Sequence, residues 1–143
     1  MEIIPAKADE ISAIKKLLKE CKLPIDDIAF EQQHFWISKY NNELIAVCGL
    51  EIMNELALLR SLAVKNLKRN SGLGTAIYEH TIEQARKIYN IHTLFLLTTT
   101  ASNFFQKHGW KFIDRNNVPN PVQQTNEFKF ICPKSAQCMK LEI

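Results

Sequence analysis

The spacing of apolar residues divides this chain into short strands and longer helices. Unbroken or alternating apolar runs, typical of strands, fall at residues 1–6, 34–40, 43–53, 56–64, 93–98, 110–114 and 137–143. Apolar residues three and four positions apart, typical of amphipathic helices, fall at residues 9–23, 75–89 and 101–108. The order is hairpins first and then strand–helix–strand, which predicts an α/β or α+β domain with one central sheet.

Turn and capping residues mark the ends of these segments. Asn41-Asn42 and Asn54-Glu55 are two-residue connections typical of β-hairpins. Asp9 is a predicted N-cap for the first helix, which ends before a proline and leads into a short helical turn at residues 25–30. Gly109 is expected to cap the last long helix. Residues 117–125 contain two prolines and predict a loop with a short helix.

Composition adds limits to this picture. With 143 residues, 46% hydrophobic and 23% charged, the chain is expected to form a single domain spanning residues 1–143. A net charge of +3 is too small to favour nucleic acid as a partner. Apolar stretches stay well below the length of a membrane span, and the N-terminus has no signal-peptide pattern, so we expect a cytoplasmic protein with no membrane partner.

A glycine-containing turn carries the strongest chemical signal. Two of the four glycines lie in the segment RNSGLG, residues 69–74, between a predicted strand and a predicted helix. Lys65 and Lys68 add positive charge beside it. Free backbone N–H groups and the positive end of the helix dipole converge at such a helix N-terminus, so the segment predicts a site for a phosphate-bearing ligand.

Two motifs in this context match a known family. Arg69-x-x-Gly72-x-Gly74, opening a helix after an apolar strand, resembles the acetyl-CoA-binding motif of the GNAT superfamily of N-acetyltransferases. The segment from Ala101 to Trp110 resembles that family's later A-x-x-F-[YF]-x-x-x-G-[FW] signature, at the usual separation. The resemblance covers nearly the whole chain. It implies the GNAT fold, a mixed central sheet of about six to seven strands flanked by helices, with acetyl-CoA as co-substrate.

A narrower resemblance concerns the acceptor. The segments LLRSLAV, LFLLTTTASNFFQKHGW and FIDRNNVP…NEFKFICPKSAQCM resemble a small bacterial branch labelled arsenic-resistance N-acetyltransferases. The tail is also similar to the acetyltransferase domain of N-acetylglutamate synthases. Both resemblances imply that the acceptor is the amine of an amino acid or of an amino-acid-like compound.

The resemblance also implies which residues hold acetyl-CoA. Backbone N–H groups from Asn70 to Thr75 cradle the pyrophosphate, and glycines there let it approach closely. The end of the strand at residues 56–64 offers backbone groups to the pantetheine arm, with an N–H near Leu62 facing the thioester oxygen. Thr98 ends the neighbouring strand, where family members splay apart. The expected set is Leu62, Ala63, Val64, Lys68, Arg69, Asn70, Ser71, Gly72, Leu73, Gly74, Thr75, Thr98 and Phe105.

Two charged residues, Glu51 and Arg60, interrupt otherwise apolar strands. A two-residue turn at 54–55 places Glu51 opposite Leu58 and Gly49 opposite Arg60, which makes the two charges diagonal neighbours on one face unless a bulge shifts the register. One interpretation is an internal salt bridge, because an unpaired buried charge is costly. The other makes Arg60 a clamp for an acceptor carboxylate and Glu51 the base that deprotonates the amine, directly or through water.

Other candidates are less specific. Many GNAT members carry a tyrosine that protonates the leaving thiolate, but the matching residue here is Phe105, and a coenzyme A thiolate can leave without it. His34 is a candidate for lining the acceptor pocket, beside a purely structural role. Cys132 and Cys138 match no standard metal-binding spacing, so no metal is expected.

The sequence therefore supports an enzyme that transfers an acetyl group to a small amine by direct attack on the thioester, acting as a monomer or homodimer. Two alternatives stay open. One is a regulatory or sensor module that binds coenzyme A without turnover. The other is a protein N-acetyltransferase.

Overall fold

The computed structural model describes residues 2–30, 32–66, 71–131 and 135–143. The strands are β1 (Ile3–Pro5), β2 (Gln33–Tyr40), β3 (Glu43–Met53), β4 (Leu56–Val64), β5 (Thr93–Thr98), β6 (Lys111–Phe112) and β7 (Gln137–Glu142). The α-helices are α1 (Ile11–Glu20), α2 (Leu73–Lys87), α3 (Ser102–Lys107) and α4 (Asn120–Gln123). Short helical segments of other types are η1 (Ala8–Glu10), η3 (Arg115–Asn117) and η4 (Glu127–Ile131).

The strands form a seven-stranded mixed sheet in the order β1-β2-β3-β4-β5-β7-β6. Only the β4–β5 pair is parallel, and it is joined by α2. Every other neighbouring pair in this order is antiparallel. The prediction of a mixed sheet with flanking helices is therefore confirmed.

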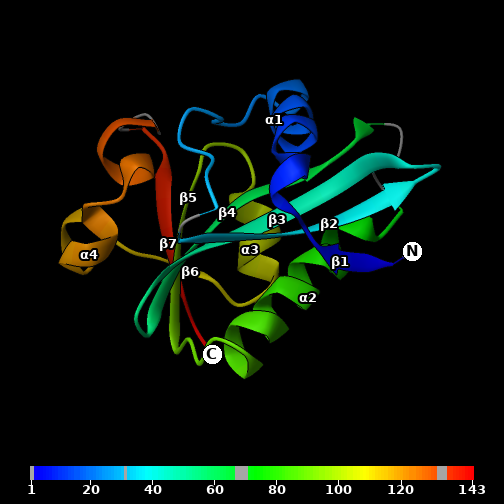
Figure 1. Cartoon of the computed structure of the whole chain (residues 1–143). Coiled ribbons are helices and arrows are strands. Elements are labelled where there is room, and N and C mark those ends of the chain that lie inside the picture. The colour runs from blue at the N-terminus through cyan, green and yellow to red at the C-terminus, as the bar shows by residue number, and fades with distance from the viewer. Residues whose placement is uncertain (1, 31, 67–70, 132–134) are drawn as a thin grey trace.

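The sheet is covered on both faces (Figure 1), with α2 on one face and α1 on the other. The α2 face holds the largest apolar cluster, which includes Ile77, Leu94 and Trp110. The opposite face holds two separate clusters. One packs α1 on β2 and β3, and the other packs the α4 region on β4, β5 and β7. The charged candidates Glu51 and Arg60 lie on this second face, because Glu51 is paired with Leu58 and Arg60 is two residues from it.

Turn residues behave largely as their chemistry predicts. Asn41 and Asn42 both have positive φ, at 49° and 66°, as the tight β2–β3 hairpin requires. Gly109 follows α3 at a φ of 92°, which confirms its capping position.

Three local predictions were wrong. Asp9 is not an N-cap but lies inside η1, where the Glu10 carboxylate accepts a hydrogen bond from the Lys7 backbone at 2.8 Å. Residues 25–30 form turns without a helix, and β6 is only two residues long, although a strand was predicted over residues 110–114.

None of the described helices is both long and apolar enough to cross a bilayer.

Candidate functional site

Strands β4 and β5 are paired only at their beginnings. Residues Leu56–Leu58 pair with Thr93–Phe95, and in the described residues no pairing between the two strands continues past that point. Beyond it β4 runs to Val64 alongside β3, while β5 runs to Thr98 alongside β7. The expected separation of the two strands is confirmed. Among the described residues, β5 does not pair with the later part of β4, and this is the edge to which an extended group can add.

A β-bulge follows the last charged residue of β4. The β3–β4 register changes between Gly49↔Arg60 and Val47↔Ala63, so β4 carries one extra residue opposite β3. Ser61, within the bulge, has a φ of 60°, a conformation that non-glycine residues seldom adopt. Because the bulge comes after Arg60, the register predicted for the charged residues holds: Glu51 pairs with Leu58 and Gly49 with Arg60.

Helix α2 begins at the end of β4. Its N-cap is Gly72, which has a φ of 83°, and among the described residues no heavy atom beyond its chain neighbours lies within 4 Å of the place where a Cβ would lie. A Cβ on Gly74 would lie 3.5 Å from the Val64 side chain, so the first turn of the helix packs against the strand end. Early N–H groups of a helix lack intrahelical acceptors. Ser71, Leu73 and Thr75 belong to this start, whereas Lys68, Arg69 and Asn70 fall outside the described residues.

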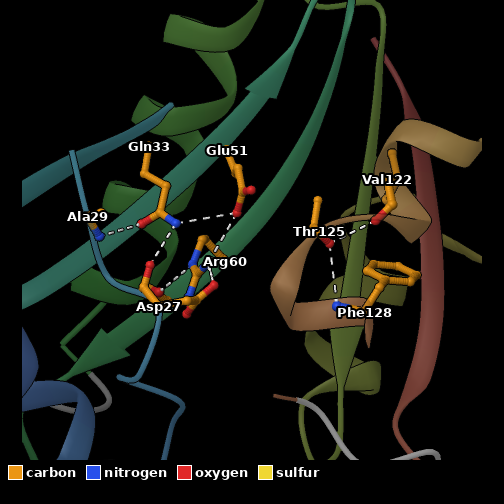
Figure 2. Close-up of polar contacts among 9 residues, drawn as sticks. Asp27, Ala29, Gln33, Glu51, Arg60, Val122, Thr125 and Phe128 are labelled. Atoms are coloured by element: carbon orange, nitrogen blue, oxygen red, sulfur yellow. Dashed lines mark hydrogen bonds and ion pairs between the residues drawn. The ribbon is translucent and has the colours of Figure 1, made fainter. Parts of the chain in front are cut away.

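On the α1 face of the sheet, Arg60 is the centre of a buried ion-pair cluster (Figure 2). Its Nη1 and Nη2 donate to the two carboxylate oxygens of Asp27, both at 2.7 Å. Its Nη1 also donates to Glu51 Oε1 at 3.2 Å, and its Nε donates to Ser61 Oγ at 3.2 Å. The Arg60 side chain has no exposed surface. The predicted salt bridge between Glu51 and Arg60 is therefore present, with a second and closer carboxylate beside it.

Charge and burial shift the titration of this cluster. Burial raises the pKa of Glu51 above its ordinary value, although the positive charge of Arg60 acts in the opposite direction. Burial alone acts to lower the pKa of Arg60. The hydrogen bond with Asp27 and the charges of Glu127, Asp27 and Glu51 outweigh burial, so the pKa rises and Arg60 stays a cation. Burial thus makes the Glu51 carboxylate a stronger proton acceptor than an exposed glutamate.

Three residues of the cluster were not found from the sequence. Asp27 lies in the turn after α1. Gln33 Nε2 donates to the Asp27 carbonyl at 3.0 Å and to Glu51 Oε1 at 3.4 Å. Glu127 is buried at the start of η4. The Phe128 N–H of η4 donates to the Thr125 hydroxyl at 3.4 Å, and that hydroxyl donates to Val122 O at 2.7 Å, which links η4 to α4 (Figure 2). In the sequence, these three residues stand out only as acidic or amide residues within or beside apolar segments. That signal is weak, because such residues also occur on exposed turns.

The other predicted site residues are separated from Arg60. His34 points to the α2 face, because neighbouring residues of a strand alternate and Gln33 faces the cluster. Its Nδ1 lies 3.3 Å from Tyr89 Oη, and burial lowers its pKa. Phe105 is 6% exposed and packs among aromatic rings of the α2-face core. We therefore do not include His34 with Arg60 and Glu51 in one acceptor site.

The backbone-donating candidates lie at the strand ends. Thr98 ends β5, and its hydroxyl accepts a hydrogen bond from the Ala101 backbone N–H at 2.9 Å, at the beginning of α3. Leu62 and Val64 pack toward the α2-face core, whereas Ala63 packs with the α1 cluster, as the bulge requires. The side chains of this strand end therefore pack against both cores, which leaves its backbone groups to be considered as donors.

The cysteines give no sign of a metal site. Cys138 is buried in β7, where burial raises its pKa to about 11, so it is a poor source of thiolate. Cys132 lies outside the described residues. Among the residues that the structure does describe, no group of three or more His, Cys, Asp or Glu side chains is placed to hold a metal ion.

Comparison with known proteins supports a single family. Residues 31–112, more than half of the chain, match the family model described as "Acetyltransferase (GNAT) domain". The chain is 29% identical over 120 residues to an uncharacterized N-acetyltransferase of Chlorobaculum tepidum, covering 82% of this chain and 73% of that protein.

Solved structures share the fold. Rv2747 of Mycobacterium tuberculosis, in complex with CoA and NLQ, matches with a TM-score of 0.81 and 21% identity, over 100% of this chain and 99% of that one. N-acetylglutamate synthase of Neisseria gonorrhoeae, complexed with coenzyme A and L-arginine, matches with a TM-score of 0.78 and 18% identity. That match covers 99% of this chain, which spans only about a third of the synthase (33%).

Three observations support acetyl-CoA as the donor: the separation of β4 from β5, the glycine-containing start of α2 and the family match. The arsenic-resistance branch receives no support from these comparisons and stays a prediction. The chain belongs to the GNAT family and is an acetyl-CoA-dependent N-acetyltransferase.

Proposed function

We propose that this enzyme acetylates the amine of a small, amino-acid-like acceptor, with Glu51 as the general base. The observation that carries the proposal is the placement of the Glu51 carboxylate. Glu51 pairs with Leu58, the last residue of β4 that pairs with β5, so it lies beside the point where the two strands separate. Arg60 and Gln33 both donate to Oε1, whereas Oε2 accepts no hydrogen bond from the described residues.

The proposed chemistry assigns one role to each group. The acceptor nitrogen attacks the thioester carbonyl carbon, the new C–N bond forms, the C–S bond breaks, and coenzyme A leaves as a thiolate. Amino groups have pKa values near about 8, so most acceptor molecules are protonated at neutral pH. Glu51 takes the ammonium proton, directly or through water. The second proton, which the nitrogen loses as the tetrahedral intermediate collapses to the amide, passes through water to the coenzyme A thiolate. Its raised pKa makes it a stronger base than an exposed carboxylate.

The donor side of the proposal uses backbone groups. The first turn of α2, from Ser71 to Thr75, binds the pyrophosphate, together with Lys68, Arg69 and Asn70. The open edge of β4 at Leu62, Ala63 and Val64 pairs with the pantetheine arm, with Thr98 and Phe105 on the far side. The fit rests on the separated strands and on Gly72, where an added Cβ would meet none of the described residues beyond its chain neighbours.

The amino-acid-like acceptor has indirect support. An N-acetylglutamate synthase is among the structural neighbours, and the sequence of the C-terminal tail resembles that of such synthases. Arg60 is the natural partner for an acceptor carboxylate, but Asp27 holds both of its terminal nitrogens in this structure. An acceptor carboxylate therefore reaches Arg60 only if Asp27 moves away.

The test is a panel of amines in which each amino acid is accompanied by its amide and its decarboxylated amine. Release of the coenzyme A thiol is followed with acetyl-CoA as donor. We expect turnover with at least one amino-acid-like amine. Glu51→Gln should lower kcat by about 10²–10⁴-fold, the usual contribution of a general base, with the KM for acetyl-CoA unchanged. Glu55→Gln, in the exposed β3–β4 turn, is the control.

Two results contradict the proposal. If Glu51→Gln retains the wild-type kcat and pH profile, Glu51 is not the base. If only peptides or proteins are acetylated, the acceptor is not a small amine.

A further inference from the structure

Asp27 is held in place by an unusually complete set of contacts for a residue outside any helix or strand. Its carboxylate makes the bidentate pair with Arg60, and its side chain is 5% exposed. Gln33 fixes the turn from both sides: Nε2 donates to the Asp27 carbonyl at 3.0 Å, and Oε1 accepts from the Ala29 N–H at 3.1 Å. Figure 2 shows the side chains of Asp27, Gln33 and Arg60 pointing toward one another. The turn therefore presents one carboxylate in a defined orientation.

The bidentate pair fixes the plane of the Arg60 guanidinium. Two parallel hydrogen bonds to one carboxylate define that plane more strictly than a single contact does. With the plane set, Nη1 also donates to Glu51 Oε1 and Nε to Ser61 Oγ. All three guanidinium nitrogens donate hydrogen bonds within the protein, and the Arg60 side chain has no exposed surface. Because two of the four hydrogen bonds, and the shortest ones, go to Asp27, the orientation of the guanidinium depends on Asp27.

We propose that Asp27 is a positioning residue for acetyl transfer: by holding Arg60 it keeps Glu51 Oε1 engaged and leaves Oε2 for the acceptor amine. This inference rests on the proposed function, in which Glu51 is the base. It assigns Arg60 the task of orienting the base, whereas a clamp role for Arg60 requires Asp27 to leave.

The charges around Glu51 give the proposal a measurable consequence. Three groups face Glu51: Arg60 from β4, Asp27 from the turn and the Gln33 amide from β2. Glu127, in η4, acts on Arg60. The negative charge of Asp27 raises the pKa of Glu51, and that of Arg60 lowers it. Removing the Asp27 charge also removes the closer of the two carboxylates that hydrogen-bond to Arg60, so Arg60 acts more strongly on Glu51, with Glu127 as its other acidic neighbour. Both effects lower the pKa of Glu51.

The experiment measures kcat and kcat/KM against pH for wild type, Asp27→Asn and Asp27→Glu, with the best acceptor of the panel. We expect Asp27→Asn to lower kcat at least tenfold and to move the acidic limb of the profile to lower pH. Asp27→Glu keeps the charge, and with it the ion pair needed for folding, but displaces the guanidinium. It should lower kcat and leave the acidic limb near its wild-type position. Asp26→Asn, an exposed acid in the same turn, is the matched control and should behave as wild type.

Other outcomes overturn the proposal in distinguishable ways. If Asp27→Asn lowers only the melting temperature, while kcat and the acidic limb stay unchanged, Asp27 is structural. If Asp27→Asn lowers the KM of acceptors that carry a carboxylate but not of their decarboxylated partners, Asp27 competes with substrate for Arg60. Glu51→Gln is measured in parallel, because retention of its acidic limb refutes the base assignment itself, whatever the Asp27 variants do.

Discussion

In the proposed function, the donor side and the acceptor side of the enzyme use different kinds of chemical group. On the donor side, the open edge of β4 and the first turn of α2 offer backbone groups, and the residues concerned are adjacent in the sequence. On the acceptor side, the groups are side chains: Asp27, Gln33, Glu51 and Arg60 come from a turn and three strands. A backbone site depends on local chain geometry, whereas a side-chain site depends on distant segments meeting correctly.

This difference has energetic consequences. The donor groups lie at ends and edges, where unpaired backbone can meet a ligand or water. The acceptor groups are buried charges that satisfy one another, so losing one partner leaves another charge without compensation. Changes on the acceptor side should therefore disturb folding and catalysis together, and changes on the donor side should disturb ligand binding alone.

The largest expected effect is that of Arg60→Met on stability. The change leaves the buried carboxylates of Asp27 and Glu51 without their cation, which should cost about 3–5 kcal/mol in the free energy of unfolding. Urea denaturation followed by circular dichroism measures it. Lys39→Met, which removes the more exposed ion pair with Glu10, should cost less than about 1 kcal/mol. An equal loss of unfolding free energy in the two variants would show that the buried ion pairs of Arg60 contribute no more than the exposed pair of Lys39.

Gly74→Gln should affect the donor side selectively. A Cβ at position 74 meets Val64 only at an ordinary contact distance, so the fold tolerates the residue, but the longer side chain projects where the phosphates approach the helix. Loss of one or two charge-assisted hydrogen bonds, at about 1.5–3 kcal/mol each, should weaken coenzyme A binding by about 100-fold. Isothermal titration calorimetry gives the affinity. Ala76→Gln, exposed and further into α2, is the control and should bind normally.

The pH dependence of the two sides should also differ. Because burial raises the pKa of Glu51 and a base works only when deprotonated, kcat/KM should fall as the pH decreases through a value above the ordinary carboxylate range. Below that pKa the rate falls about tenfold per pH unit. The affinity for acetyl-CoA, measured over the same range, should be the same in wild type and Glu51→Gln. If the affinity for acetyl-CoA falls with pH in the same way as kcat/KM does, Glu51 acts on donor binding as well as on catalysis, which contradicts the prediction.

Ser61→Ala should have the smallest effect. Ser61 Oγ accepts from Arg60 Nε at 3.2 Å, a contact secondary to the bidentate pair with Asp27. Its loss should cost about 1 kcal/mol in unfolding free energy and lower kcat only slightly. Chemical denaturation and steady-state kinetics provide the two values. A loss of kcat as large as that of Asp27→Asn indicates that the bulge, rather than Asp27, orients the guanidinium.

Much of the fold followed from local patterns. The bounds of β3, β4 and β5 are those that the apolar runs predict, because a buried strand needs an unbroken or alternating apolar surface between turn residues. The Glu51–Arg60 ion pair followed from one hairpin, since a two-residue turn fixes which residues face each other. Predictions failed at Asp9 and at residues 25–30, where short-range propensity competes with tertiary packing.

By itself, the sequence determined the strand and helix order, the glycine-containing start of α2 and the pairing of Glu51 with Arg60. Each of these depends on residues close in the chain, whose geometry is set by backbone sterics and side-chain alternation. Only the tertiary structure decided that Asp27, 33 residues from Arg60, holds both terminal nitrogens of its guanidinium, and that His34 lies on the other face. The reason is physical: a buried charge requires a partner, but which distant segment supplies it is settled by how the chain packs.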